Sequence, residues 1–331
     1  MKTLIIPLTA ILLGGCATMQ SKSPAVSILV DLDPTSVDRT VIVEGITADK
    51  EGRLYLPDRV SGNILRVDPK SPKTVVVGRI DAREIKGKKV NADGGGIAFN
   101  QQGDLFIASA PFAEVVRIRA ADLNAAKPGT AQTFATGTEG ANGIVFDRQS
   151  NLFVSGGASG RVYRVGPGGG PAETALQIEP HTRTLPDGKT QQATVANGLE
   201  FDASGNLYVA DTARGAIWKV ERLPGGKSAK PVLFAQSPLL EGADGIAFDG
   251  SGKLWVTANE RNALVTVTAD GKVDEQVKNG SQGPLEFPGA IVFVGNTAYV
   301  NNYDVPRRDN LAADGKTSID GIGASIAQIT F

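Results

Sequence analysis

Four oxygen-bearing side chains stand at the same place in a repeated sequence pattern. Each comes immediately before a Gly-Ile or Gly-Leu pair, and they are Glu44, Asn142, Asn197 and Asp244. Two further copies of the pattern have glycine at this place, Gly95 and Gly289, which leaves room beside the other four. Two carboxylates and two amide oxygens form a hard-oxygen set that suits one divalent cation and leaves positions for water or substrate. Ca²⁺ fits this set best, with Zn²⁺ or Mg²⁺ as alternatives.

Each of these residues also has a purely structural interpretation. Asn-Gly and Asp-Gly pairs are common in tight turns, and polar residues at a wet channel mouth need no function. A turn role does not explain the pair Glu44-Gly45, so the set as a whole is harder to attribute to turns. From the residues alone, a metal site and a set of solvated turn positions both remain open.

The pattern that carries these residues recurs six times. Its core is x-G-[IL]-x-F-D, a turn, and L-[YFW]-V, as in NGLEFDASGNLYV and DGIAFDGSGKLWV. The copies begin at residues 44, 95, 142, 197, 244 and 289. Apolar runs that alternate with polar residues between Gly, Asn, Asp and Ser turns are typical of antiparallel strands. A period of roughly 40–50 residues with several strands per unit predicts the blades of a propeller.

The expected fold is therefore all-β, a six-bladed β-propeller that forms a single domain over residues 26–331; an ordinary β-sandwich is the alternative. We expect blades at about 40–84, 90–138, 139–190, 194–239, 241–280 and 286–331. An unpaired edge strand invites aggregation, so the β-like segment 26–33 should complete the last blade by pairing with the C-terminal segment 325–331. The first strand of each blade lines the channel, so the six x residues should converge near its axis.

The N-terminus reads as an export signal. It contains Lys2 and an apolar run, residues 4–13, that is too short to span a bilayer. Leu-Gly-Gly before Cys16 resembles the lipobox of bacterial lipoproteins, which implies a signal peptide over 1–15, a lipidated Cys16 and a tether over 16–25. Several acyl chains on one residue suffice for stable anchoring. Ala17 favours, by similarity to enteric lipoproteins, the periplasmic face of the outer membrane. A plain secretory signal with an incidental cysteine is the alternative.

Composition excludes several functions. The 331 residues include 40 Gly, 34 Lys plus Arg and 35 Asp plus Glu, so the chain is turn-rich, has no basic excess and is not predicted to bind nucleic acid. Cys16 is the only cysteine, which excludes an intramolecular disulfide. There is no G-x-x-x-x-G-K-[ST] loop and no G-x-S-x-G elbow. The only histidine, His181, lies in the long connection 180–194, where a solvated loop role explains it more readily than a general base.

The sixfold pattern, with NGLEFD, YVADT and DGIAFDGSGKLWV, resembles the senescence-marker/gluconolactonase family of six-bladed propellers over about residues 40–300. The resemblance implies that Glu44, Asn197 and Asp244 bind one divalent metal, that Asn142 holds substrate or a water, and that Asp244 also acts as the base. The chain departs from the family where Gly45-Ile46-Thr47 replaces Gly-Pro with a nearby tryptophan, where Gly140 replaces a frequent arginine, and in the sixth copy, FPGAIVF. These departures put a sugar-acid lactone substrate in doubt.

Two functions of different class follow. The first is a metal-dependent lactone or ester hydrolase of the cell envelope, in which Asp244 helps to deliver water and Asn142 orients a small-molecule substrate. The second is a non-catalytic propeller lipoprotein that binds a ligand or a protein, with a structural metal or none. Other chemistry of the superfamily, such as a strictosidine-synthase-like activity, is a third possibility. In each case the membrane is reached only through the lipid anchor, and a monomer is the default.

Overall fold

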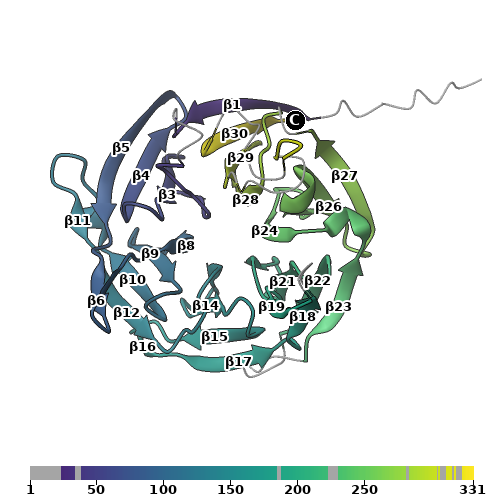
Figure 1. The fold of residues 1–331 in the computed structure, drawn as a ribbon, viewed down its shortest axis with the longest axis horizontal. Coiled ribbons are helices and arrows are strands. Elements are labelled where there is room, and N and C mark those ends of the chain that lie inside the picture. Colours follow the sequence, from purple (N-terminus) through teal and green to yellow (C-terminus); the bar gives the residue numbers. More distant parts are fainter. Residues whose placement is uncertain are drawn as a thin grey trace, which may run out of the picture.

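Six sheets of four or five strands stand around a common axis (Figure 1). The computed structural model describes residues 24–33, 39–184, 188–222, 230–280, 283–303, 305, 311–314, 317 and 323–331. The arrangement confirms the predicted all-β, six-bladed propeller. The predicted signal peptide, Cys16 and nearly all of the predicted tether lie outside the described residues. Across the described ranges, no helix is long and apolar enough to cross a membrane.

Each blade runs from an inner strand at the channel to an outer strand at the rim. Blade 1 contains β2 (Thr47–Ala48), β3 (Leu54–Pro57), β4 (Asn63–Asp68) and β5 (Ser71–Arg79). Blade 2 contains β8 (Gly94–Phe99), β9 (Leu105–Ser109), β10 (Glu114–Ile118) and β12 (Gln132–Thr136). Blade 3 contains β13 (Ile144–Phe146), β14 (Leu152–Ser155), β15 (Arg161–Val165) and β17 (Glu173–Gln177).

The other three blades follow the same plan. Blade 4 contains β20 (Leu199–Phe201), β21 (Leu207–Asp211), β22 (Ala216–Val220) and β23 (Val232–Gln236). Blade 5 contains β24 (Ala243–Phe248), β25 (Leu254–Ala258), β26 (Ala263–Val267) and β27 (Val273–Lys278). Blade 6 contains β28 (Pro288–Val294), β29 (Thr297–Asn302), β30 (Ser325–Thr330) and β1 (Ala25–Asp31).

Short elements decorate this frame. Two of them add to the outer edges of blades 1 and 2, namely β11 (Gly129–Thr130) beside β5 and β16 (Gly170–Pro171) beside β12. Short 3₁₀ turns occur in the connections, at η1 (Ala120–Asp122), η3 (Pro238–Leu240) and η4 (Asn259–Arg261). The long connections 80–93 and 180–194 each contain a hairpin. The first is formed by β6 (Arg83–Ile85) with β7 (Lys88–Val90), and the second by β18 (His181–Thr184) with β19 (Thr190–Ala193). His181 therefore lies on a hairpin strand and not in an irregular loop.

The two ends of the chain close the ring, as predicted. Strand β1 pairs antiparallel with β30, from Ala25 opposite Thr330 to Asp31 opposite Ser325, and the two lie side by side in Figure 1. The strand ends at Asp31 rather than at residue 33, because the Asp31 side chain turns back to accept a hydrogen bond from the backbone N–H of Asp33 at 2.9 Å. Blade 6 therefore has no free edge on either side of β30.

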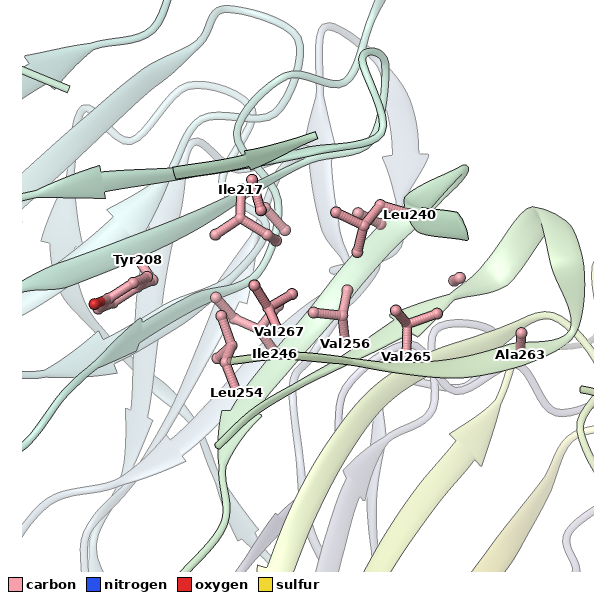
Figure 2. Close-up of a cluster of buried hydrophobic side chains, with 13 residues drawn as sticks. Tyr208, Ile217, Leu240, Ile246, Leu254, Val256, Ala263, Val265 and Val267 are labelled. Atoms are coloured by element: carbon pink, nitrogen blue, oxygen red, sulfur yellow. The ribbon is translucent and has the colours of Figure 1, made fainter. Parts of the chain in front are cut away.

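The repeated aromatic residues form the core between neighbouring blades. The ring in L-[YFW]-V of one blade meets the phenylalanine of x-F-D in the next, edge to face, with centroids 4.9–6.1 Å apart. The pairs are Tyr55–Phe99, Phe106–Phe146, Phe153–Phe201, Tyr208–Phe248 and Trp255–Phe293. Aliphatic side chains complete each layer, as Ile217 of blade 4 and Ile246 and Val256 of blade 5 do in Figure 2.

The inner strands approach one another so closely that the residue after x has no room for a side chain. A Cβ atom on Gly45 would lie 2.5 Å from the carbonyl oxygen of Gly95, and one on Gly143 would lie 2.6 Å from that of Asn197. The same contact recurs at Gly96, Gly198 and Gly245. Blade 6 differs, because its residue after x is Ala290 and the close approach falls on the x residue Gly289, where a Cβ atom would lie 2.7 Å from the oxygen of Glu44. The glycines thus permit close backbone approach rather than a turn.

A methyl group in this ring should therefore destabilise the propeller. We expect Gly143→Ala to lower the free energy of unfolding by about 1–3 kcal/mol, because the backbone of Asn197 must move to admit the methyl group. Gly250→Ala is the matched control, since a Cβ atom there meets nothing within 4 Å. Its effect should stay within about 0.5 kcal/mol. Urea unfolding of both variants checks the prediction, and equal effects would contradict it.

Candidate functional site

Glu44 and Asn142 meet across the channel mouth. The amide Nδ2 of Asn142 donates to Oε1 of Glu44 at 3.3 Å, although 98 residues separate them. They belong to blades 1 and 3. Blade 2 lies between these and has Gly95 as its x residue, so no side chain intervenes there. The glycine at this position therefore provides the space that the sequence pattern predicted.

Asp244 forms a second group with two asparagines. Its carboxylate is buried, and Oδ2 accepts a hydrogen bond from Nδ2 of Asn259 at 2.9 Å. Asn197 also hydrogen-bonds to this carboxylate. Nδ2 of Asn197 donates a hydrogen bond to the hydroxyl oxygen of Thr212 at 3.0 Å. This hydroxyl in turn donates to the carbonyl of Ala243 at 2.7 Å.

The charges of the two groups act on each other. Burial, and then the negative charge of Glu44, raise the pKa of the Asp244 carboxyl well above its ordinary value. Burial also raises the pKa of Glu44, although the charge of Arg59 works in the opposite direction. The structure therefore brings Glu44, Asn142, Asn197 and Asp244 together at one mouth.

Arg59 is the main feature of this mouth that the sequence analysis missed. Its Nη1 donates to Oε2 of Glu44 and, at 2.6 Å, to the hydroxyl of Tyr303. Its Nε and Nη2 form a two-pronged ion pair with the carboxylate of Asp93. Glu44 thus has a resident counter-charge, and the Arg59 guanidinium group is shared between the carboxylates of Glu44 and Asp93.

A second repeat position explains where these extra residues come from. Arg59, Thr212 and Asn259 each lie 15 residues after the x residue that they contact, one or two residues beyond the second strand of the blade. Tyr303 likewise follows the second strand of blade 6, at a spacing of 14 residues from Gly289. The fixed spacing in NGLEFDASGNLYVADT could have identified this second ring from the sequence. Asp93 has no such signal, because it ends the connection that contains β6 and β7.

The donor set fits a divalent cation, although one of its carboxylate oxygens already accepts a hydrogen bond from Arg59. One buried and one partly buried carboxylate, both with raised pKa values, are the groups whose charge a cation would compensate. Within the described ranges, no three His, Cys, Asp or Glu side chains cluster to hold a metal, so amide oxygens must complete the set. The buried Oδ1 of Asn259, beside Asp244, has no partner in the described part of the chain. The carboxylate oxygen that already has a partner is Oε2 of Glu44, to which Arg59 donates.

Beyond the x residues the channel is apolar. It encloses about 460 Å³ and is lined by glycine, isoleucine, alanine, valine and phenylalanine of the inner strands. Of its described lining residues, Glu200 is the one with an ionisable side chain. Polar chemistry is therefore confined to the mouth. His181 is paired with Ala193 in its hairpin.

A family model described as the SMP-30/Gluconolactonase/LRE-like region matches residues 42–300. The matched segment contains all four oxygen-bearing x residues together with Arg59 and Asp93. No curated protein sequence matches the chain.

Solved propellers with different activities share the fold. A gluconolactonase from Xanthomonas campestris is 16% identical, with a TM-score of 0.63 over 93% of this chain and 89% of that one. A luciferin-regenerating enzyme is 15% identical, with a TM-score of 0.61 over 93% and 95%. A virginiamycin B lyase from Staphylococcus aureus is 12% identical, with a TM-score of 0.58 over 93% and 99%. At these identities the likeness shows the fold and does not choose a reaction.

Removing the guanidinium group of Arg59 should reveal how much the partly buried Glu44 carboxylate destabilises the fold when it has no cationic partner. We expect Arg59→Gln to lower the free energy of unfolding at pH 8, in a metal chelator, by about 2 kcal/mol. Burial raises the pKa of Glu44, so acidification protonates it before an exposed glutamate and removes the need for a counter-charge. The deficit should therefore shrink as the pH falls toward about 4, the ordinary glutamate pKa. Denaturant unfolding at both pH values tests this; a deficit independent of pH would mean that Arg59 acts by packing.

Proposed function

The chain belongs to the SMP-30/gluconolactonase/LRE-like family, and on this premise we propose that it is a metal-dependent hydrolase that opens a lactone or a related ester. The observation that carries the proposal is the meeting of Glu44, Asn142, Asn197 and Asp244 at one channel mouth. The apolar channel below leaves the mouth as the place where a polar substrate would bind.

Glu44, Asn197 and Asp244 would hold the cation, most readily Ca²⁺, with Zn²⁺ or Mg²⁺ as alternatives. When bound, such a cation polarises a carbonyl and acidifies a water. Thr212 orients Asn197 and Asn259 orients Asp244, so the ligand side chains would be held before the cation arrives.

Asp244 is the candidate base. Its raised pKa makes it a stronger proton acceptor than an exposed aspartate, and its burial keeps bulk water from competing for the proton. Asn142 would orient the substrate, because its amide lies at the mouth on the opposite side of Glu44 from Arg59. The proton of the attacking water would thus pass to Asp244 while Asn142 holds the substrate in place.

A non-catalytic binding propeller is the second candidate. The contact that favours it is the hydrogen bond from Arg59 to Glu44, which gives the carboxylate a partner without any metal. In that case the mouth would be a charged recognition site, and its carboxylates would bind a ligand or protein without turning it over.

Metal content and activity of one variant separate these candidates. A chain of residues 23–331, which keeps all described strands, should bind about one divalent cation and hydrolyse a member of a lactone and ester panel. Asp244→Ala should remove the cation and lower turnover by at least about 10²-fold, because it deletes both a ligand and the base. Arg59→Gln keeps all three proposed ligands and should retain the cation. Elemental mass spectrometry and rate measurements provide the readouts; an active Asp244→Ala variant would refute the hydrolase.

We also propose that the protein is anchored in the bacterial cell envelope through lipid on Cys16, most readily at the periplasmic face of the outer membrane. The support is the Leu-Gly-Gly-Cys ending of the N-terminal apolar segment. Cys16→Ala should abolish incorporation of labelled palmitate and move the protein out of the membrane fraction, since no other residue would carry the anchor. A variant that remains labelled would contradict the proposal.

A further inference from the structure

A cavity of about 580 Å³ lies between blades 3 and 4, away from the channel mouth. We call it the blade 3–4 cavity; it is bordered by the turns 147–149 and 202–205 and by Phe153, Arg164 and Arg222. Those turns follow the inner strands β13 and β20, whereas the x residues precede them. The cavity is therefore at the opposite end of the blades from the candidate metal site. Its volume is in the range of small-molecule pockets.

The outer strand of blade 3 lacks an aromatic ring that the outer strands of blades 2 and 4 have. In blades 2, 3 and 4 the outer strand has a bulge, and the bulged residues are Phe134, Ala175 and Phe234. Phe134 packs on Phe106 at 4.8 Å and Phe234 packs on Tyr208 at 5.1 Å, which fills the layer toward the next blade. Ala175 offers only a methyl group at this place, so no ring from the outer strand covers Phe153, which borders the cavity.

Blade 1 shows the same relation between the bulged residue and the space beside it. Its bulged residue is Val77, which is also smaller than phenylalanine, and a cavity of about 290 Å³ lies between blades 1 and 2. Blade 5 differs, because its bulged residue is Gln276 and Phe331 packs on Trp255 at 5.0 Å instead.

Three arginines give the blade 3–4 cavity a cationic wall. The Nη2 atoms of Arg148, Arg164 and Arg222 donate to the oxygens of Ala203 at 2.6 Å, of Asn151 at 2.8 Å and of Gln149 at 2.8 Å. All three acceptors are neutral. In the part of the chain that the structure describes, none of these guanidinium groups has a carboxylate partner.

The carboxylates nearby are occupied elsewhere. Asp147 and Asp202 accept hydrogen bonds from backbone N–H groups of their own turns, at 2.8 Å, and Glu221 pairs with Lys219 at 3.6 Å. Burial raises the pKa of Glu200, on the inner side of the cavity, to about 7, so about half of this group is uncharged at neutral pH. The arginines thus keep most of their capacity to bind an anion.

The floor of the cavity is apolar and aromatic. Phe153 and Phe201 meet edge to face at 5.2 Å, and Phe146, Leu207 and Val220 complete the surface. Guanidinium groups bind carboxylate, sulfonate and phosphate with two parallel hydrogen bonds, and aromatic rings bind flat apolar groups.

We propose that the blade 3–4 cavity binds a small amphipathic anion, an aryl or alkyl carboxylate or sulfonate, with its charged group on the arginines and its apolar body on the phenylalanine rings. This site is independent of the proposed hydrolase activity. It gives the propeller a second ligand site at the end opposite the channel mouth.

The test uses 2-naphthoate as the probe, with calorimetry on the chain of residues 23–331. Ala175→Phe restores the ring that blades 2 and 4 carry, and by analogy with Phe134 this ring would lie on Phe153 and Arg164. We expect binding to weaken at least about tenfold, a loss of about 1.4 kcal/mol. Arg164→Gln should weaken binding without filling the cavity, which keeps the test valid if Ala175→Phe does not fold.

Matched variants test whether 2-naphthoate binds in this cavity and not elsewhere on the propeller. Arg117 of blade 2 is the counterpart of Arg164, because Arg117 pairs with Phe106 in the way that Arg164 pairs with Phe153. Arg117→Gln should therefore leave binding unchanged. Asp244→Ala should also leave binding unchanged, because it alters the opposite end of the blades. The proposal is overturned if 2-naphthoate does not bind, if neither Ala175→Phe nor Arg164→Gln weakens it, or if 2-naphthylmethylamine binds equally well.

Discussion

The close approach of the six inner strands at the channel mouth is the constraint on which the rest of the site depends. Each x residue presents its carbonyl to the backbone of a neighbouring blade, which requires glycine at the following position in blades 1 to 5 and at x itself in blade 6. The approach lets side chains from blades that are not adjacent reach each other, as Asn142 reaches Glu44 past Gly95. A looser ring would leave the same polar residues as separate, solvated turn positions. The glycines are therefore as much a part of the site as the residues that carry oxygen.

The same close approach brings two negative charges near each other, and only one of them has a cationic partner. Asp244 is buried and Glu44 is partly buried, and the loss of contact with water raises the pKa of both. Arg59 compensates one of these charges and is held in place by Asp93 and Tyr303. Asp244 receives only amide hydrogen bonds, so its charge is the less well compensated. A site of this kind lowers the stability of the fold but keeps a carboxylate that can still bind a cation or a proton.

Departures from the repeat are informative because the repeat itself has a clear structural purpose. The phenylalanine of x-F-D and the aromatic residue of L-[YFW]-V pack together between blades, so their recurrence reports folding. Positions where one copy differs, such as Ala175 against Phe134 and Phe234, change the packing of one layer only. The blade 3–4 cavity lies in a layer with such a difference, and three arginines border it. A repeat protein can thus acquire a second site without disturbing the ring.

By itself the sequence determined the fold, because strand alternation and the interval between copies are local patterns that recur in register. It also determined the four x residues, and the second ring at a spacing of 15 residues was present in the same repeat. Only the tertiary structure decided that Arg59 contacts Glu44 and Asp93, since Asp93 comes from a connection without any period. The blade 3–4 cavity also needed the tertiary structure, because a space between two blades exists only once they are packed together.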